Sequence, residues 1–451
     1  MRCLALLSAA AAVVGFVSCA GDRRPPVEAC ARMPGASSET ATAAPSEPFL
    51  GMLMQLDTGV VLARLDPLSL EPVSRKVVLG EYHHTWSLSP DGSQLALGVS
   101  SGGSYISATK RIGTRIGILI VDLKAMKAVG EVETGIAAEA LAWLGPRLLV
   151  AGLQRGGTVL VDSLNGRILR RWPRFSFPEA SAGVPDGLVM LFRGPLRSPS
   201  EGTATGVARL AVVDARGRLR SIVLGRIQLS TRYADGLFYE DTASLAVDPD
   251  RARAYVFAAN APVADVDLRT MRVSYHRLEA FFLSPGELRG TKVGQEDVRA
   301  RIRRALWLGD GRVLVFGRDL VPAGREGLPS IAAGATMVNT ARWSSCTLDA
   351  KAGGAAFVAG KVLTYGSGDP ASRGLRGYTV QGQAAFHLVD GERVSDIQAA
   401  GHLAYVRGRV IEVSPQGGTR STVYVVDVRS GKILREITPR GELIDVVAGS
   451  S

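Results

Sequence analysis

The chain has 451 residues, of which 46% are hydrophobic and 21% are charged, a composition that excludes wholesale disorder. Its formal net charge is +11, but the arginines are scattered and no basic run is interleaved with aromatic residues. We therefore expect no nucleic-acid partner. The excess charge indicates solubility and a weak attraction to anionic polymers of a cell envelope.

Residues 1–18 are predicted to be a signal peptide that is absent from the mature protein. Arg2 supplies a positive charge, and residues 4–17 are a stretch of apolar or small residues that is too short for a membrane span. The segment ends in FVSC, which resembles the lipobox of bacterial lipoproteins, although Phe16 stands where Leu is usual. The resemblance implies that Cys19 is lipidated. The alternative is an ordinary secretory signal that happens to contain this cysteine.

Residues 19–48 are predicted to be a disordered linker, because Ala, Ser, Thr, Pro and Glu dominate and no apolar periodicity is present. A tethered domain needs such a polar linker, which favours the lipid anchor. No later stretch reaches the ~18–20 apolar residues of a transmembrane helix. The mature protein is therefore predicted to be anchored to a bacterial membrane on its extracytoplasmic side.

Two kinds of short unit alternate from Phe49 onward. The first leads from a strand through a turn to a more apolar strand, as in TWSLSPDGSQLALGVS from Thr85. The second has an Asp before its turn, as in GILIVDLKAMKAVGEVETG from Gly117 and STVYVVDVRSGKILREI from Ser421. One unit of each kind makes four antiparallel strands, and repetition at about 40–50 residues is typical of a radial array. Residues 49–451 are therefore predicted to form an all-β propeller of seven or eight four-stranded blades.

The two ends of this region complement each other. The stretch from Gly51 to Leu79 supplies the later strands of a blade, and Glu442 to Ala448 supplies a first strand without followers. Together they predict one blade shared between the N- and C-terminal ends, which removes the free sheet edge. Counting this blade gives eight units. The number is seven if one of the weak units, around Leu348 and around Tyr378, is an insertion.

Residues 284–304 interrupt the pattern and are predicted to be a charged, helical insertion, because acidic residues come early and basic residues late. The basic cluster of this segment comprises Arg299, Arg301, Arg303 and Arg304. A solvated face explains such a run more simply than a partner-binding site does.

Two phrases of the chain resemble repeats of bacterial propellers of the YVTN type and the WD40-like, PD40 type. They are SLSPDGSQLALG from Ser87 and YVFAANAPVADVDLRTMRV from Tyr255, and only residues 89–92 match the Ser-Pro-Asp-Gly turn fully. The resemblance implies the fold and an extracytoplasmic setting. It implies no chemistry, because such repeats occur in binding proteins and in enzymes alike.

Cys30 and Cys346 are two spare thiols in a compartment that we expect to be oxidising. They could form a disulfide that ties the linker to a blade. Alternatively, one could be exposed and the other buried as a small apolar residue. The sequence leaves both arrangements open.

The chain has no Cys-x-x-Cys or His-x-x-x-His spacing and no phosphate-binding loop. We therefore predict no catalytic residue, no bound metal and no cofactor. Polar residues do gather where the first strands of the blades begin, at the mouth of the central channel. The candidate ligand-site residues there are His83, His84, Glu139, Asp241, Arg303, Asp396 and Asp445. Such a ring could bind a cation or orient a water, but loops at any channel mouth are polar, and we prefer this plainer interpretation.

The sequence thus predicts a monomeric, lipid-anchored propeller that acts as a non-enzymatic binding or scaffold module for a protein or an envelope polymer. The alternative is an extracytoplasmic propeller enzyme with its site at the channel mouth. The enzyme classes compatible with that alternative are a metal-dependent lactonase-like hydrolase and a quinoprotein-like dehydrogenase.

Overall fold

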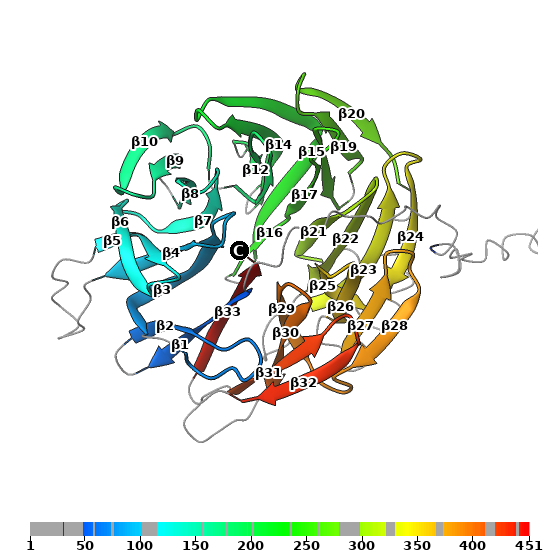
Figure 1. Cartoon of the computed structure of the whole chain (residues 1–451). Helices are drawn as coiled ribbons and strands as arrows, with labels where there is room; N and C mark the ends of the chain where they lie inside the picture. Colours follow the sequence, from blue (N-terminus) through cyan, green and yellow to red (C-terminus); the bar gives the residue numbers. More distant parts are fainter. Residues whose placement is uncertain are drawn as a thin grey trace, which may run out of the picture.

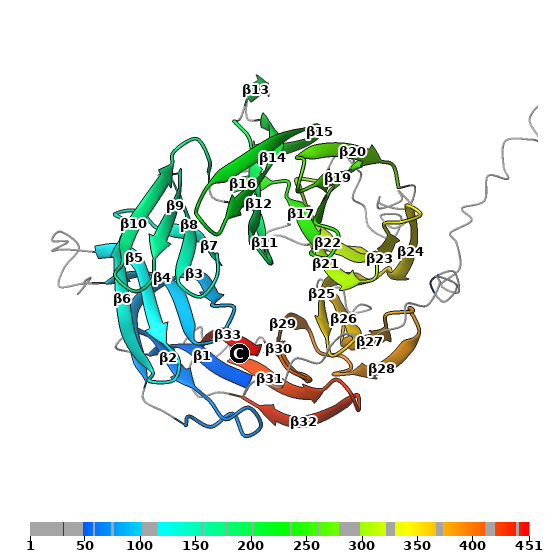
Figure 2. The same ribbon diagram turned by 45° about the horizontal axis from the view of Figure 1, so that its top comes forward.

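The computed structural model of the chain describes Cys30 and residues 48–450, apart from 57–58, 74–75, 102–114, 155–156, 177, 196, 201–202, 235–236, 260, 279–297, 322–329, 367–372, 411–419 and 439–441. Its strands form a ring of β-sheets, the blades, around a central axis (Figure 1, Figure 2). The ring has eight four-stranded blades, so the predicted β-propeller is confirmed. Of the two blade numbers that the sequence allows, seven and eight, the structure has eight. Both weak sequence units are complete blades.

The first four blades contain strands β1 to β16 together with the last strand of the chain. Blade 1 consists of β33 (Glu442–Ser450), β1 (Pro48–Leu56), β2 (Gly59–Arg64) and the first part of β3 (Val77–Leu88). Blade 2 consists of the second part of β3, β4 (Gln94–Ser101), β5 (Arg115–Asp122) and β6 (Lys127–Glu133). Blade 3 consists of β7 (Ala138–Trp143), β8 (Leu148–Leu153), β9 (Gly157–Asp162) and β10 (Arg167–Trp172). Blade 4 consists of β11 (Ala180–Val184), β12 (Gly187–Arg193), β14 (Thr203–Asp214) and β15 (Leu219–Ala234), extended by β13 (Arg197–Ser200) and β16 (Leu237–Glu240).

The other four blades follow one another in chain order. Blade 5 consists of β17 (Ala243–Asp248), β18 (Arg253–Ala258), β19 (Val263–Asp267) and β20 (Arg272–His276). Blade 6 consists of β21 (Ala300–Gly309), β22 (Arg312–Leu320), β23 (Ser330–Asn339) and β24 (Ser344–Asp349). Blade 7 consists of β25 (Ala352–Val358), β26 (Lys361–Gly366), β27 (Leu375–Thr379) and β28 (Ala384–Leu388). Blade 8 consists of β29 (Val394–Ala400), β30 (Leu403–Val410), β31 (Arg420–Asp427) and β32 (Lys432–Ile437).

Blade 1 closes the ring with strands from both ends of the chain, as the sequence predicts. β33 pairs antiparallel with β1 in a register that places Met52 opposite Val446 and Leu53 opposite Asp445. β1 then pairs with β2, and β2 pairs with the first residues of β3. The C-terminus therefore lies at the inner side of the ring (Figure 1, Figure 2).

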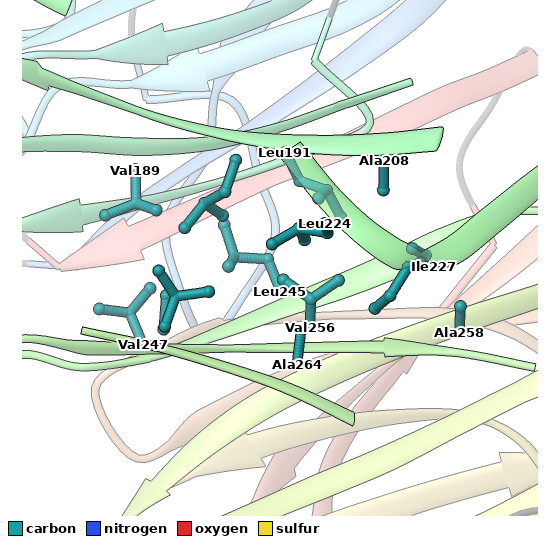
Figure 3. Packing of buried hydrophobic residues seen from close by; sticks show 14 of the residues in the cluster. Val189, Leu191, Ala208, Leu224, Ile227, Leu245, Val247, Val256, Ala258 and Ala264 are labelled. Carbon is teal, nitrogen blue, oxygen red and sulfur yellow. The ribbon is translucent and has the colours of Figure 1, made fainter. Parts of the chain in front are cut away.

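The hydrophobic core is divided among the junctions between neighbouring blades, because apolar residues on both faces of each sheet pack against the sheets beside it. The described residues form one buried cluster at each junction. Figure 3 shows the cluster between blades 4 and 5, where Val189 and Leu191 of β12 pack with Leu245 of β17. Second strands of the blades, such as β8, β12 and β18, are thus buried on both sides, which explains why they are nearly continuous apolar runs in the sequence.

The repeated aspartates lie at the turn between the third and fourth strands of the blades. In blade 5, Asp267 Oδ1 accepts hydrogen bonds from the backbone N–H groups of Arg269 at 2.8 Å and Thr270 at 2.9 Å. Such a side chain stabilises a tight turn because it pairs backbone donors that the strands leave free. The same role is filled in other blades by Asp66, Asp122, Asp162, Asp214, Asn339 and Asp427.

The predicted helical insertion over 284–304 is wrong for its last residues, which form the start of β21. Arg303 pairs with Gly317 and Arg304 pairs with Phe316 in the ladder between β21 and β22. These ladder hydrogen bonds and the burial of Arg303 outweigh the intrinsic helix preference of the sequence. Residues 284–297 lie outside the described residues.

Cys30 and Cys346 are joined by a disulfide with a distance of 5.4 Å between their Cα atoms. Cys346 belongs to β24, and both cysteines are buried in the cluster between blades 6 and 7. The predicted signal peptide, Cys19 and the rest of the linker up to residue 47 lie outside the described residues. No helix in the described part of the chain is long and apolar enough to span a bilayer.

Candidate functional site

The face of the ring at which the first strand of each blade begins is called the mouth face here. Four of the candidate residues lie in the first halves of inner strands, as expected: Glu139 in β7, Arg303 in β21, Asp396 in β29 and Asp445 in β33. Asp241 lies between β16 and β17. The structure therefore places the predicted positions on one face but gives their side chains different surroundings.

His83 and His84 lie within β3 and not before it. The pairing of β3 with β4 shifts register between Tyr82 and Trp86, and the two histidines fall in that irregularity. β3 is longer than the sequence suggests because it ends blade 1 and begins blade 2. The side chains of both histidines lie outside the described part of the structure.

The segment between β16 and β17 is joined to blade 6, because Asp241 and the Thr242 hydroxyl accept hydrogen bonds from the backbone N–H groups of Arg301 and Arg303. The Asp241 carboxylate accepts hydrogen bonds from the Ser230 hydroxyl and, at 2.9 Å, from the backbone N–H of Arg301. The Arg303 guanidinium donates to Asp319 Oδ1 at 2.7 Å, and both side chains are buried, at 5% and 3% exposure. A buried ion pair with satisfied partners holds an inner strand in place. Both residues are therefore used structurally.

Asp396 and Asp445 are close enough to influence each other. Asp445 Oδ2 accepts a hydrogen bond from the Trp86 indole at 2.9 Å, and Asp396 Oδ2 accepts one from the Gln398 amide at 2.9 Å. Burial raises the pKa of Asp445, and the negative charge of Asp396 raises it further, against the opposing effect of the Trp86 hydrogen bond. Glu139 is exposed and forms no hydrogen bond with any described residue.

The described residues contain no group of three or more His, Cys, Asp or Glu side chains that could hold a metal ion. Within that part of the chain the predicted ring of ligands is thus divided. Asp241 and Arg303 have separate partners, the backbone N–H of Arg301 and the carboxylate of Asp319, whereas Asp396 and Asp445 of blades 8 and 1 influence each other.

A cavity of about 250 Å³ opens on the mouth face between blades 6, 7 and 8. We call it the arginine pocket, because Arg304, Arg318 and Arg393 line it. Its other lining residues are Ile302, Phe316, Gly317, Gly353, Gly354, Tyr365, Gly366, Val394, Ser395 and Asp396. Asp396 is therefore the one candidate residue from the sequence that lines this pocket.

The backbone of blades 6 and 7 creates the space for these side chains. Arg304 and Arg318 are exposed, whereas Arg303, between Ile302 and Arg304 on β21, turns to its buried partner Asp319. In blade 7, Gly354 pairs with Tyr365 across β25 and β26. A Cβ atom at Gly354 would lie 2.1 Å from Tyr365 Cζ, so only glycine lets the Tyr365 ring lie flat against this backbone.

Tyr365 supplies a neutral donor to the arginine pocket. Burial raises the pKa of Tyr365 to about 12, and the negative charge of Asp396 adds to the effect, while Arg304 and Arg318 oppose it. The phenol is therefore protonated at physiological pH and carries a hydrogen that it can donate.

Sequence reasoning found the position of Arg304 but assigned it to a solvated helical face, and it missed Arg318, Arg393 and Tyr365. The available signal was a basic residue at the end of an apolar strand, as in RVLVFGRDL of β22. That signal is weak by itself, because only the ring brings the three blades together.

No protein-family model matches the chain, and no curated protein matches it. Among solved structures, the chain is similar to the dihydro-heme d1 dehydrogenase NirN in complex with DHE. The TM-score is 0.52 at 15% identity, over 92% of this chain and 77% of that chain. Apo AztD from Citrobacter koseri gives a TM-score of 0.45 at 13% identity, over 90% of this chain and 98% of that chain. BamB from Moraxella catarrhalis gives a TM-score of 0.43 at 12% identity, over 82% of this chain and 90% of that chain. At these identities the likeness to NirN shows the propeller fold alone.

Proposed function

We propose that this protein is a lipid-anchored, extracytoplasmic binding or scaffold module that presents its mouth face to a protein or an envelope polymer. The observation that carries the binding role is the arginine pocket, a concave and strongly polar site formed by three blades. The signal segment and the polar linker support the location. The protein acts as a monomer in this proposal, because the shared blade already closes the ring without a second copy.

Binding at the mouth face is tested in cells with a photoreactive amino acid at one of two exposed positions. Position 395 lies at the arginine pocket, and position 434 lies on the outer strand β32. We expect a discrete covalent adduct with an envelope partner from position 395 and none from position 434. Equal adducts from both positions, or none from position 395, would contradict the proposed binding face.

The lipid anchor is tested by the variant Cys19→Ala, with Cys3→Ala as the matched control inside the predicted signal peptide. We expect Cys19→Ala to move the protein from the membrane fraction to the soluble extracytoplasmic fraction, because the acyl chains that hold it are lost. Cys3→Ala should leave the distribution unchanged. The lipoprotein proposal fails if the Cys19→Ala protein stays membrane-bound at full length.

A further inference from the structure

The arginines of the pocket differ from several other arginines of the ring in having no ion-pair partner among the residues that the structure describes. None of Arg304, Arg318 and Arg393 forms an ion pair or a side-chain hydrogen bond with any residue that the structure describes. Elsewhere guanidinium groups have carboxylate partners: Arg147–Asp162, Arg193–Glu179, Arg253–Asp265, Arg303–Asp319 and Arg376–Asp349. Three cations around one cavity repel one another, so the site gains stability when an anion enters it.

The charge of the pocket lining sets the charge of the ligand. The three guanidinium groups contribute +3 and the carboxylate of Asp396 contributes −1, which leaves a net charge of +2. One oxygen of Asp396 already accepts a hydrogen bond from the side-chain amide of Gln398, which lies two residues further along the same strand, β29. A ligand with two negative charges would neutralise the site.

The donors of the pocket set the chemistry of the ligand. Guanidinium groups present paired N–H donors whose spacing matches the oxygens of carboxylate and phosphate groups. The Tyr365 hydroxyl adds a neutral donor from blade 7. Donors thus come from three blades toward one small volume, which suits a compact group with several oxygen acceptors.

We propose that the arginine pocket binds a dianionic oxygen group, namely a phosphate group or a pair of carboxylates, as the anchoring point of the ligand. This inference rests on the proposed binding role of the mouth face and names the ligand chemistry for it. The cavity of about 250 Å³ holds a compact dianionic group, which is either a free small molecule or the charged end of an envelope component.

The test is isothermal titration calorimetry on the purified full-length protein, with inorganic phosphate and succinate as separate probes and sodium chloride at matched ionic strength as the blank. We expect saturable binding of at least one dianion with a Kd of about 1 mM or tighter. A preference for phosphate assigns a phosphate ligand, and a preference for succinate assigns a dicarboxylate. No saturable binding of either probe would overturn the proposal.

Three variants identify the site. Arg304→Gln and Arg318→Gln should each weaken binding by about tenfold or more, because each removes a charge-assisted hydrogen bond. Arg435→Gln, which changes an exposed arginine of the outer strand β32, should leave the affinity unchanged. Unchanged melting temperatures of the variants show that the fold is intact, and equal affinities of all three variants would overturn the assignment of the site.

The outcome separates this inference from the proposed function. If position 395 forms its adduct with a partner in cells but neither dianion binds, the ligand chemistry is wrong and the binding face stands. If a dianion binds and no adduct forms, the ligand chemistry stands and the partner role is wrong.

Discussion

The turn aspartates show how single residues build every blade. Backbone N–H donors of the turn keep the pKa of these carboxyl groups below the usual range, as at Asp66, Asp214 and Asp267. In six of these turns the residue four positions after the Asx has a positive φ, and four of the six are not glycine: φ is 47° at Met126 and 55° at Met271. The conformation that completes the turn is therefore adopted even where the side chain disfavours it.

Loss of a turn aspartate is expected to destabilise the protein at neutral pH. The variant Asp267→Ala removes the acceptor for two backbone N–H groups and should lower the free energy of unfolding by about 1 kcal/mol, as the loss of a capping side chain does in a helix. The matched control is Asp250→Ala, because Asp250 is an exposed carboxylate whose side chain forms no hydrogen bond with the described residues. Urea denaturation at pH 7 measures the difference.

The pH dependence of this difference follows from the lowered pKa of Asp267. A carboxyl group with a lower pKa in the folded state stabilises the protein above its unfolded pKa of about 4, and this contribution disappears as the pH falls through the folded pKa. The difference in the free energy of unfolding between the wild type and Asp267→Ala should therefore become smaller below about pH 4. A gap that stays constant from neutral to acidic pH would show that the charge of Asp267 is not what holds the turn.

At the scale of strands, the sequence predicts the type of most elements because each pair of strands carries its own local pattern. The prediction is wrong at β21, where the pattern of Arg301, Arg303 and Arg304 indicates a polar helix and the structure has a strand. The reason is that Arg303 is buried through an ion pair with Asp319 on the next strand, and no periodicity reveals that pairing. The length of β3 is missed for a related reason, since one strand serves two blades.

The arginine pocket was beyond sequence reasoning for a different reason. Its lining comes from β21 and β22, β25 and β26, and the start of β29, which are three separate repeats. Each repeat contributes only one or two polar side chains at the end of an apolar strand. Whether these side chains come together depends on the angle between neighbouring blades. The residues of a single blade do not determine that angle. The candidate aspartates were easier to place because they depend only on where an inner strand begins.

At the scale of the whole molecule, ring closure makes the two ends of the chain depend on each other. Leu443, Val446 and Val447 of β33 are buried in the clusters on both sides of blade 1. Asp445 adds its hydrogen bond to Trp86 of blade 2. The disulfide of Cys30 ties the segment before the propeller to the far side of the ring, at blade 6. The sequence could predict this closure because each end of the propeller region carries only part of a blade. Joining the two parts in one blade is the arrangement that leaves no sheet edge free.

Removal of β33 should therefore unfold the protein. Deleting residues 442–451 takes away the ladder that β1 forms with β33 and exposes apolar residues of blades 8, 1 and 2. Each backbone group left buried without a partner costs about 1–3 kcal/mol, and a domain has only about 5–15 kcal/mol of stability, so a few such groups suffice. We expect the truncated protein to aggregate or to lack a cooperative melting transition in calorimetry. The control Leu434→Asp, at an exposed site on β32, should melt like the wild type. A truncated protein that melts within about 2 °C of the full-length one would mean that β33 contributes no more than a frayed terminus, and the shared blade would not be what closes the ring.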